Sequence, residues 1–136
     1  MKVRETSIQF ETKDKIELVD LTVKVQNFVR NADIAEGFCM IFTKHSTATI
    51  VVNENEPGLK EDIIQMAKNI IPGGDYKHNK IDTNATSHLV ATLFSPSKIF
   101  PISKGILEHG PWQSIFFLEL DGPRGIRKVT LKAIGN

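Results

Sequence analysis

Alternating polar and apolar residues near the start of the chain predict a β-hairpin. The alternation runs through residues 6–12, stops at the polar residues 13–15 and resumes over residues 16–21. Successive side chains of a strand point to opposite faces of a sheet, so a period of two is typical of a half-buried strand. Two such runs with a short polar turn between them form the pattern of a hairpin.

The apolar spacing then changes to the three- and four-residue period of a helix. Val25 and Phe28 fall on one face, with Asp20 or Thr22 available as the N-cap. Glycine is common just after the last helical residue, so Gly37 is expected to end this first helix.

Two further helices are predicted in the middle of the chain. Pro57-Gly58 opens an amphipathic segment that continues to residue 71 and ends at Pro72-Gly73-Gly74. Asn84 is suited to cap a short third helix over residues 85–94.

The remaining apolar runs predict strands. Residues 37–45 and 48–52 form two of them. Three or four more follow the third helix, and the last two of these are joined by a turn at residues 121–125. The pattern indicates an α+β domain in which a mostly antiparallel sheet dominates and helices are inserted between groups of strands.

Length and charge favour one globular domain that acts on small molecules. A chain of 136 residues is long enough for one core, so residues 1–136 are expected to form a single domain. The net charge of +1 provides no basic field to attract phosphate backbones, and nucleic acid is therefore not expected as a partner.

The amino terminus and the cysteine content favour the cytoplasm. The first residues contain no apolar run that would serve as a signal or membrane anchor, so no membrane partner is expected. Cys39 is the only cysteine and has no partner for a disulfide within the chain. It lies in an apolar run, where a free thiol packs as a small hydrophobic group.

Histidines are the main candidates for chemistry. His78 and His88 lie in one polar stretch, with His78 in a predicted loop and His88 on the predicted third helix. Neutral imidazole is a common metal ligand, so this pair could hold a divalent ion such as zinc or magnesium with a third ligand from His45, Asp82 or Glu119. Their spacing is not a tight metal motif, and the alternative that both histidines cap turns stays open.

Two charged residues near the end of the chain are further candidates. Glu119 follows an apolar strand, where a carboxylate must be paired, protonated or at a sheet edge. It is a candidate base or orienting group. Arg124 could clamp an anion with its planar guanidinium or pair with Asp121 across the turn.

Trp112 and Gln113 precede the same strand. The indole offers a flat surface for ligand stacking or a plug for the core, and the amide both donates and accepts hydrogen bonds. His109 lies just before them and is expected to be a solvated turn residue.

Several segments in order resemble the YjbQ-like family, whose members are often labelled secondary thiamine-phosphate synthase. They are KHSTATIVVNENE, YKHN, TNATSHL, GPWQ leading into IFFLELDGPR, and a closing basic strand. The resemblance covers nearly the whole chain. Two departures from the usual pattern are His109-Gly110-Pro111 before the tryptophan and Ser87 before the second histidine.

The resemblance implies a barrel- or sandwich-like sheet with two to three inserted helices, assembled as a homotrimer with a polar cleft. It implies catalytic or metal-binding roles for His45, His78 and His88 and a catalytic role for Glu119. It also implies substrate-binding roles for five polar or aromatic residues: Thr47, Asn84, Trp112, Gln113 and Arg124.

Three classes of function follow from these candidates. The first is a small enzyme with a histidine-rich cleft, which the resemblance associates with thiamine-phosphate synthesis as a main or side activity. The second is a binding module that recognises a small phosphorylated metabolite without turning it over. The third is a scaffold in which the same residues stabilise contacts between subunits.

Overall fold

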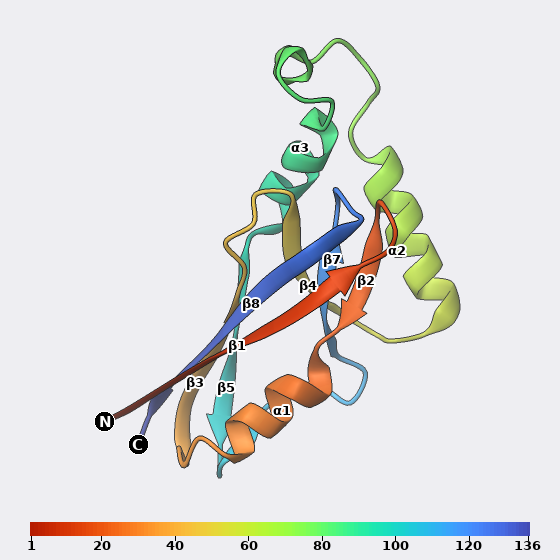
Figure 1. Cartoon of the computed structure of the whole chain (residues 1–136). Coiled ribbons are helices and arrows are strands. Elements are labelled where there is room, and N and C mark those ends of the chain that lie inside the picture. Colours follow the sequence, from red (N-terminus) through yellow and green to blue (C-terminus); the bar gives the residue numbers. More distant parts are fainter.

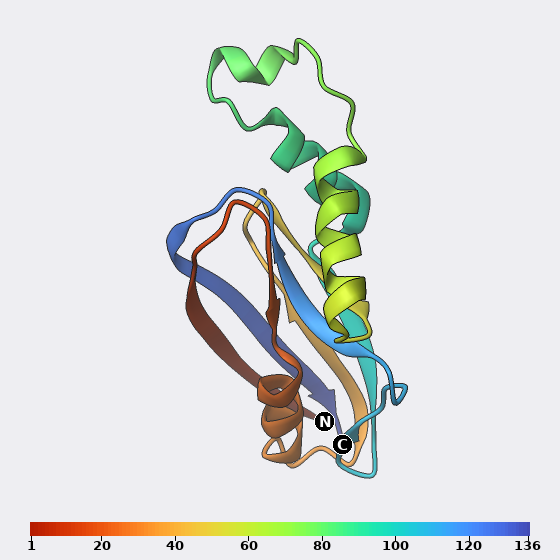
Figure 2. The same ribbon diagram turned by 90° about the vertical axis from the view of Figure 1, so that its right-hand side faces the viewer.

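Two antiparallel β-sheets face each other and enclose the main hydrophobic core (Figures 1 and 2). A computed structural model describes all 136 residues. The larger sheet has five strands in the order β1-β8-β3-β5-β6, and the smaller has three in the order β2-β7-β4. The strands are β1 Lys2–Thr12, β2 Glu17–Asp20, β3 Glu36–Phe42, β4 Ala48–Asn53, β5 Ser97–Ser103, β6 Ile106–Leu107, β7 Ser114–Glu119 and β8 Arg124–Gly135.

The helices cover the open sides of this sandwich. They are α1 Thr22–Arg30, α2 Pro57–Asn69, the 3₁₀-helix η1 Lys77–Lys80, and α3 Ala85–Phe94. Helix α1 lies at the end of the molecule that holds both termini, whereas α2 and α3 lie outside the smaller sheet (Figures 1 and 2). The segment that carries η1 projects beyond the sheets at the opposite end. None of the helices combines the length and apolar character needed to span a bilayer.

Strand β7 shows how the alternating pattern builds two cores. Ile115 and Phe117 point into the main core between the sheets, which has 18 buried residues. Leu118 and Leu120 belong to a smaller cluster that also includes Ala67 of α2 and Val90 of α3. Because β7 is the middle strand of its sheet and is covered on both faces, its sequence is apolar at nearly every position.

The predicted α+β class, the single domain and the inserted helices are confirmed, but the predicted hairpin is wrong. Strand β1 pairs with β8, and β2 pairs with β7 in the other sheet. The polar residues after β1 form a corner between the sheets, and the turn from β7 to β8 is a second such corner. The two corners meet where the N–H of Gly122 donates to the carbonyl of Lys15 at 3.0 Å.

Gly37 does not end the first helix, which stops at Arg30. It lies in β3 opposite Gly135 of β8. A Cβ atom on Gly37 would lie 2.1 Å from the carbonyl oxygen of Ile134, so glycine here permits a close approach of two strands.

Candidate functional site

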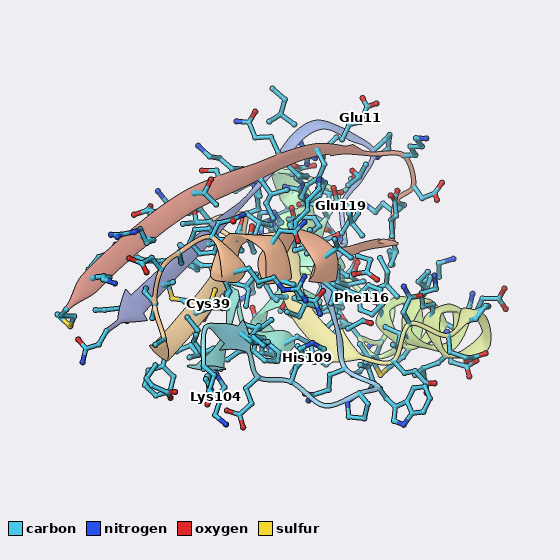
Figure 3. The ribbon with its side chains drawn as sticks, turned by 90° about the horizontal axis from the view of Figure 1, so that it is seen from below. Glu11, Cys39, Lys104, His109, Phe116 and Glu119 are labelled. Atoms are coloured by element: carbon cyan, nitrogen blue, oxygen red, sulfur yellow. The ribbon has the colours of Figure 1, made fainter.

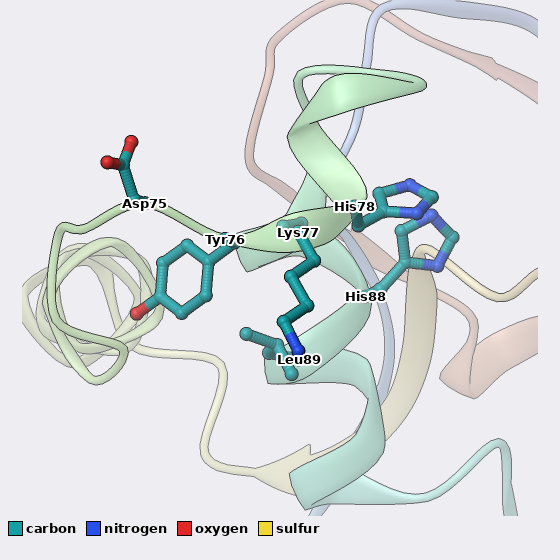
Figure 4. A pocket seen from close by; sticks show the side chains of 7 residues that line it. Asp75, Tyr76, Lys77, His78, His88 and Leu89 are labelled. Carbon is teal, nitrogen blue, oxygen red and sulfur yellow. The ribbon is translucent and has the colours of Figure 1, made fainter.

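A pocket of about 500 Å³ lies between the η1 segment and the first turns of α3 (Figure 4). Seven residues line it: Asp75, Tyr76, Lys77, His78, Ala85, His88 and Leu89. Tyr76 and Leu89 provide apolar surface, and Lys77 provides a positive charge. This combination suits a small molecule with an apolar part and an anionic group.

His78 and His88 lie side by side in this pocket (Figure 4). Their ring centroids are 4.7 Å apart, and the ring planes are inclined by 75°. The side chain of His78 is exposed and that of His88 is half-buried, so both imidazoles are accessible from solvent. Imidazole is the most frequent proton donor and acceptor in general acid–base catalysis, so two neighbouring rings provide groups for both roles.

A hydrogen-bonded chain anchors His78 to the β7–β8 corner. Nε2 of His78 lies 2.9 Å from Oδ1 of Asn84. The Asn84 amide nitrogen donates to Oδ2 of Asp121 at 2.8 Å. Asn84 precedes α3 as predicted, but its side chain makes no capping hydrogen bond. Asn79 does so instead, since its Oδ1 accepts from the N–H of Ala85 at 3.1 Å.

Asp121 is held ionised by two cations. Lys15 from the β1–β2 corner and Arg124, whose guanidinium is 2.9 Å away, both pair with its carboxylate. Burial alone would raise the pKa of Asp121, but hydrogen bonds from Lys15 and Asn84 and the Lys15 charge outweigh it, so the pKa lies below its ordinary value. Arg124 therefore pairs across the turn, which was one of its two predicted roles.

Glu119 lies fully buried at the end of the main core. Its carboxylate accepts from Nε of Arg127 at 2.8 Å, from a second Arg127 nitrogen, and from the hydroxyl of Thr12 at 2.7 Å. Burial raises the pKa of Glu119, and the bonds from Arg127 and Thr12 with the Arg127 charge lower it by more, so the acid stays ionised. Of the options set by the sequence, pairing is the one observed.

The Glu119 network leads toward the pocket. Arg127 also donates to the hydroxyl of Thr47 at 3.0 Å, and the Asp121 N–H donates to Glu119 at 3.3 Å. Thr47, Glu119, Arg124 and Asn84, all candidates from the sequence, thus belong to one network that ends at His78. Glu119 does not line the pocket, so its place in this network is that of an orienting group.

His45 lies apart from the other two candidate histidines. Its Nε2 accepts a hydrogen bond from the N–H of Lys128 at 3.0 Å, and its ring meets Phe117 edge-on with centroids 6.4 Å apart. Burial and the nearby Arg127 charge lower the pKa of His45. The half-buried ring is therefore neutral at neutral pH, with Nδ1 carrying the proton.

A zinc or magnesium ion would need more ligands than this pocket provides. Nowhere in the chain do three or more His, Cys, Asp or Glu side chains gather in a group that could hold an ion. His78 and His88 are adjacent, and Asp75 is the only carboxylate that lines their pocket. A zinc site needs three or four protein ligands and magnesium prefers oxygen ligands, so this chain's side chains do not complete a site for either ion.

Trp112 and Gln113 lie away from the pocket. Neither residue lines it. Both precede Ser114, the first residue of β7, which is about 17 Å from Glu119 at the other end of a strand that rises about 3.4 Å per residue. Trp112 is 72% exposed and so is not a core plug. Gln113 accepts a hydrogen bond from the N–H of Gly110.

His109 is not the solvated turn residue that the sequence suggested. It lies against α1 (Figure 3), where its Nε2 is 2.9 Å from the side-chain nitrogen of Gln26. Its Nδ1 is 2.8 Å from the carbonyl oxygen of Gly110. Both ring nitrogens are thus occupied within the fold.

The site prediction omitted four residues of this network: Thr12, Lys15, Asp121 and Arg127. Arg127 lies on the same buried face of β8 as Val129 and Leu131. In the same way, Glu119 shares a face of β7 with Phe117. Opposite charges on two apolar faces are the signal of a buried ion pair. No comparable pattern in the sequence predicts the bond from Asn84 to Asp121.

Comparison with known proteins agrees with this fold. The model of the family described as UPF0047 protein YjbQ-like matches residues 6–136. A UPF0047 protein of Archaeoglobus fulgidus is 41% identical over 128 residues, which cover 93% of this chain and 98% of the relative. A UPF0047 protein of Methanothermobacter thermautotrophicus is 40% identical over 136 residues, covering 99% of this chain and 94% of the relative.

Solved structures show the same architecture. A YbjQ-like protein of unknown function from Sulfolobus solfataricus P2 superimposes with a TM-score of 0.97 at 45% identity, covering 99% of both chains. A hypothetical protein from Aeropyrum pernix K1 gives a TM-score of 0.92 at 36% identity, covering 98% of this chain and 99% of the other. The chain therefore belongs to the UPF0047 YjbQ-like family.

Proposed function

We propose that the chain is an enzyme that performs acid–base catalysis on a small anionic metabolite in the pocket of His78 and His88. The observation that carries this proposal is the pair of imidazoles, 4.7 Å apart, inside a pocket of about 500 Å³. One imidazole removes a proton from the substrate and its neighbour supplies a proton to the group that leaves or rearranges.

The charge of the pocket supports an anionic substrate. Lys77 lies on its wall and makes no ion pair within the chain, and Asp75, the one acid on the wall, directs its carboxylate away from the two imidazoles (Figure 4). Either histidine adds a second positive charge when protonated. Phosphate and carboxylate groups are the common metabolite anions that such a set recognises.

Thiamine-phosphate synthesis, which the resemblance implies, is the first reaction to test. A C–N bond forms between the pyrimidine methylene carbon and the thiazole nitrogen, while the C–O bond to the diphosphate breaks and pyrophosphate leaves. Lys77 and a protonated histidine would stabilise the charge that develops on the leaving pyrophosphate.

The test compares the parent with His78→Gln, His88→Gln and a control, His109→Gln. Thiamine phosphate formation is measured with the pyrimidine diphosphate and the thiazole phosphate, and phosphate release with a panel of phosphate monoesters. Removing a group that stabilises developing charge costs about 10²- to 10³-fold, and removing a general acid or base costs about 10²- to 10⁴-fold, so the two pocket variants should lose at least about 100-fold in turnover. The control should retain its rate, since His109 faces α1.

Full turnover in both pocket variants would overturn the assignment of the site. A parent that binds these phosphates in the pocket but turns none over would instead support the alternative of a binding module.

We also propose that copies of the chain associate into the implied homotrimer through the outer face of the larger sheet. One cross-strand row on this face is apolar on four neighbouring strands: Val3, Ile134, Phe38 and Pro101. Phe38 is 56% exposed and the nearby Ile99 is 63% exposed. Exposed apolar surface of this extent marks association sites.

A second copy suits this face because it carries charges of both signs. Lys132 and Glu5 lie in the next row and pair at 3.4 Å, so this face has no net charge that would repel the surface of another copy. Light scattering coupled to gel filtration should give a three-chain particle for the parent and a single chain for Ile99→Lys. A monomeric parent at micromolar concentration would contradict the proposal.

A further inference from the structure

We infer that Asn84 and Asp121 are positioning residues that hold His78 with its proton on Nε2 and with Nδ1 free for proton transfer. Its catalytic meaning rests on the proposed function, but the position of the proton follows from the hydrogen bonds alone.

Asp121 determines which atom is the donor in each of the two hydrogen bonds that connect it, through Asn84, to His78. Its carboxylate is ionised, because Lys15 and Arg124 both pair with it and its pKa is lowered. An ionised carboxylate has no proton to donate and only accepts hydrogen bonds. The Asn84 atom at 2.8 Å from Asp121 must therefore be the amide nitrogen.

The orientation of Asn84 then determines that of the proton on His78. With its nitrogen directed to Asp121, Asn84 presents Oδ1, which only accepts, to Nε2 of His78 at 2.9 Å. Nε2 must therefore carry the proton. In the neutral ring Nδ1 then has a free lone pair, and no protein group binds it.

An amide is suited to this position because it has a hydrogen-bond donor at one end and an acceptor at the other. It donates to a carboxylate at one end and accepts from an imidazole at the other, and Asn84 is 94% buried in doing so. Direct contact between Asp121 and His78 would place a net charge next to the ring. Burial of the amide excludes water that would otherwise compete for Nε2.

His45 and His109 serve as internal controls, because each carries its proton on the other ring nitrogen. The N–H of Lys128 donates to Nε2 of His45, so His45 carries its proton on Nδ1. The carbonyl of Gly110 accepts from Nδ1 of His109, so His109 also has its proton on Nδ1. His78 should therefore differ from both in one spectrum.

The test is the one-bond ¹H–¹⁵N signal of the imidazole N–H groups in the full-length protein at a pH where His78 is neutral. In the parent, His78 should give a protected Nε2–H signal, whereas His45 and His109 give Nδ1–H signals. Asn84→Ala should abolish the His78 signal by opening Nε2 to exchange with water. Asn79→Ala, which removes the cap of the same helix but no bond to His78, should preserve it.

A His78 proton on Nδ1 in the parent, or an unchanged Nε2–H signal in Asn84→Ala, would overturn the inference. Turnover is measured on the same samples. A protected signal that depends on Asn84 in a protein without turnover would support the positioning role and contradict the proposed function. Turnover by a parent that lacks this signal would support the proposed function and contradict the positioning role.

Discussion

The carboxylate of Glu119 and the guanidinium of Arg127 form a buried ion pair that joins the two sheets. Glu119 is on β7 of the smaller sheet and Arg127 is on β8 of the larger one. Their side chains are 0% and 5% exposed. Thr12 and Thr47 complete the hydrogen bonds, and no buried side-chain polar atom in the chain lacks a partner.

Removing one member of this pair should strongly destabilise the fold. Arg127→Met leaves the Glu119 carboxylate buried without its counterion, which costs about 3–5 kcal/mol of unfolding free energy. Urea denaturation monitored by circular dichroism measures this loss. The control is Glu5→Gln in the exposed pair with Lys132, where less than about 1 kcal/mol is expected. Equal losses in the two variants would show that burial of the Glu119 pair has no energetic effect.

Acidification should lower stability through His45. The folded-state pKa of His45 lies below its ordinary value of about 6.5, so the unfolded chain binds the proton more tightly. The contribution is complete above about pH 6.5 and is lost as the pH falls toward the folded-state pKa. The parent should lose stability between pH 7 and 5.5, and His45→Gln should lose less. A parent that gains stability over this range would contradict the sign.

Protonation of Glu119 should also lower the stability of the fold, but at a lower pH. Its pKa is lowered in the folded state, so its contribution is present above the unfolded value of about 4.3 and is lost as the pH falls through the folded value. Acid unfolding of Glu119→Gln should therefore depend less on pH below about 4.5 than that of the parent. A variant with an unchanged acid transition would exclude Glu119 as the titrating group.

Gly37→Ala should be destabilising for steric reasons. The added methyl would lie 2.1 Å from the Ile134 carbonyl oxygen, so β3 and β8 must separate at a cost of about 1–3 kcal/mol. Gly125→Ala is the matched control, because nothing lies within 4 Å of the added atom. Thermal unfolding should show a lower midpoint for the first variant only. A stable Gly37→Ala protein would mean that the strands part without cost.

Lys104→Asn should stabilise the β5–β6 hairpin. Lys104 and Gly105 form its two-residue turn, with φ angles of 52° and 76°. Asparagine adopts positive φ more readily than lysine, and a gain of about 0.5 kcal/mol is expected. Lys104→Val should have the opposite effect, because a β-branched residue is strained there. The unfolding free energies of the three proteins should rank in the order Asn, Lys, Val.

Local patterns in the sequence predicted the helices well. The predicted start at Pro57 and the predicted segment 85–94 agree with α2 and α3, because proline preference at a helix start and apolar spacing act within one or two turns. Strand partners depend on residues far apart in the chain. The predicted hairpin failed for this reason, since neither β1 nor β2 reveals in its own sequence that its partner lies near the carboxyl end.

The sequence predicted which residues belong to the site better than it predicted their contacts. His78 and His88 come together because they flank one loop and the helix after it, which sequence proximity suggests. His45 is separated from them because its ring is directed toward Lys128 of β8, 83 residues later. Asn84 was predicted to cap a helix, and only the fold shows that its side chain donates to Asp121 instead.

The central claim is that the pocket of His78 and His88 is the site where this protein meets its substrate. The most direct measurement is a titration with pyrophosphate that follows the ring C–H resonances of all four histidines. We predict saturable shifts for His78 and His88, with His45 and His109 unchanged. Shifts confined to His45 or His109, or no shift in any histidine at millimolar pyrophosphate, would contradict the claim.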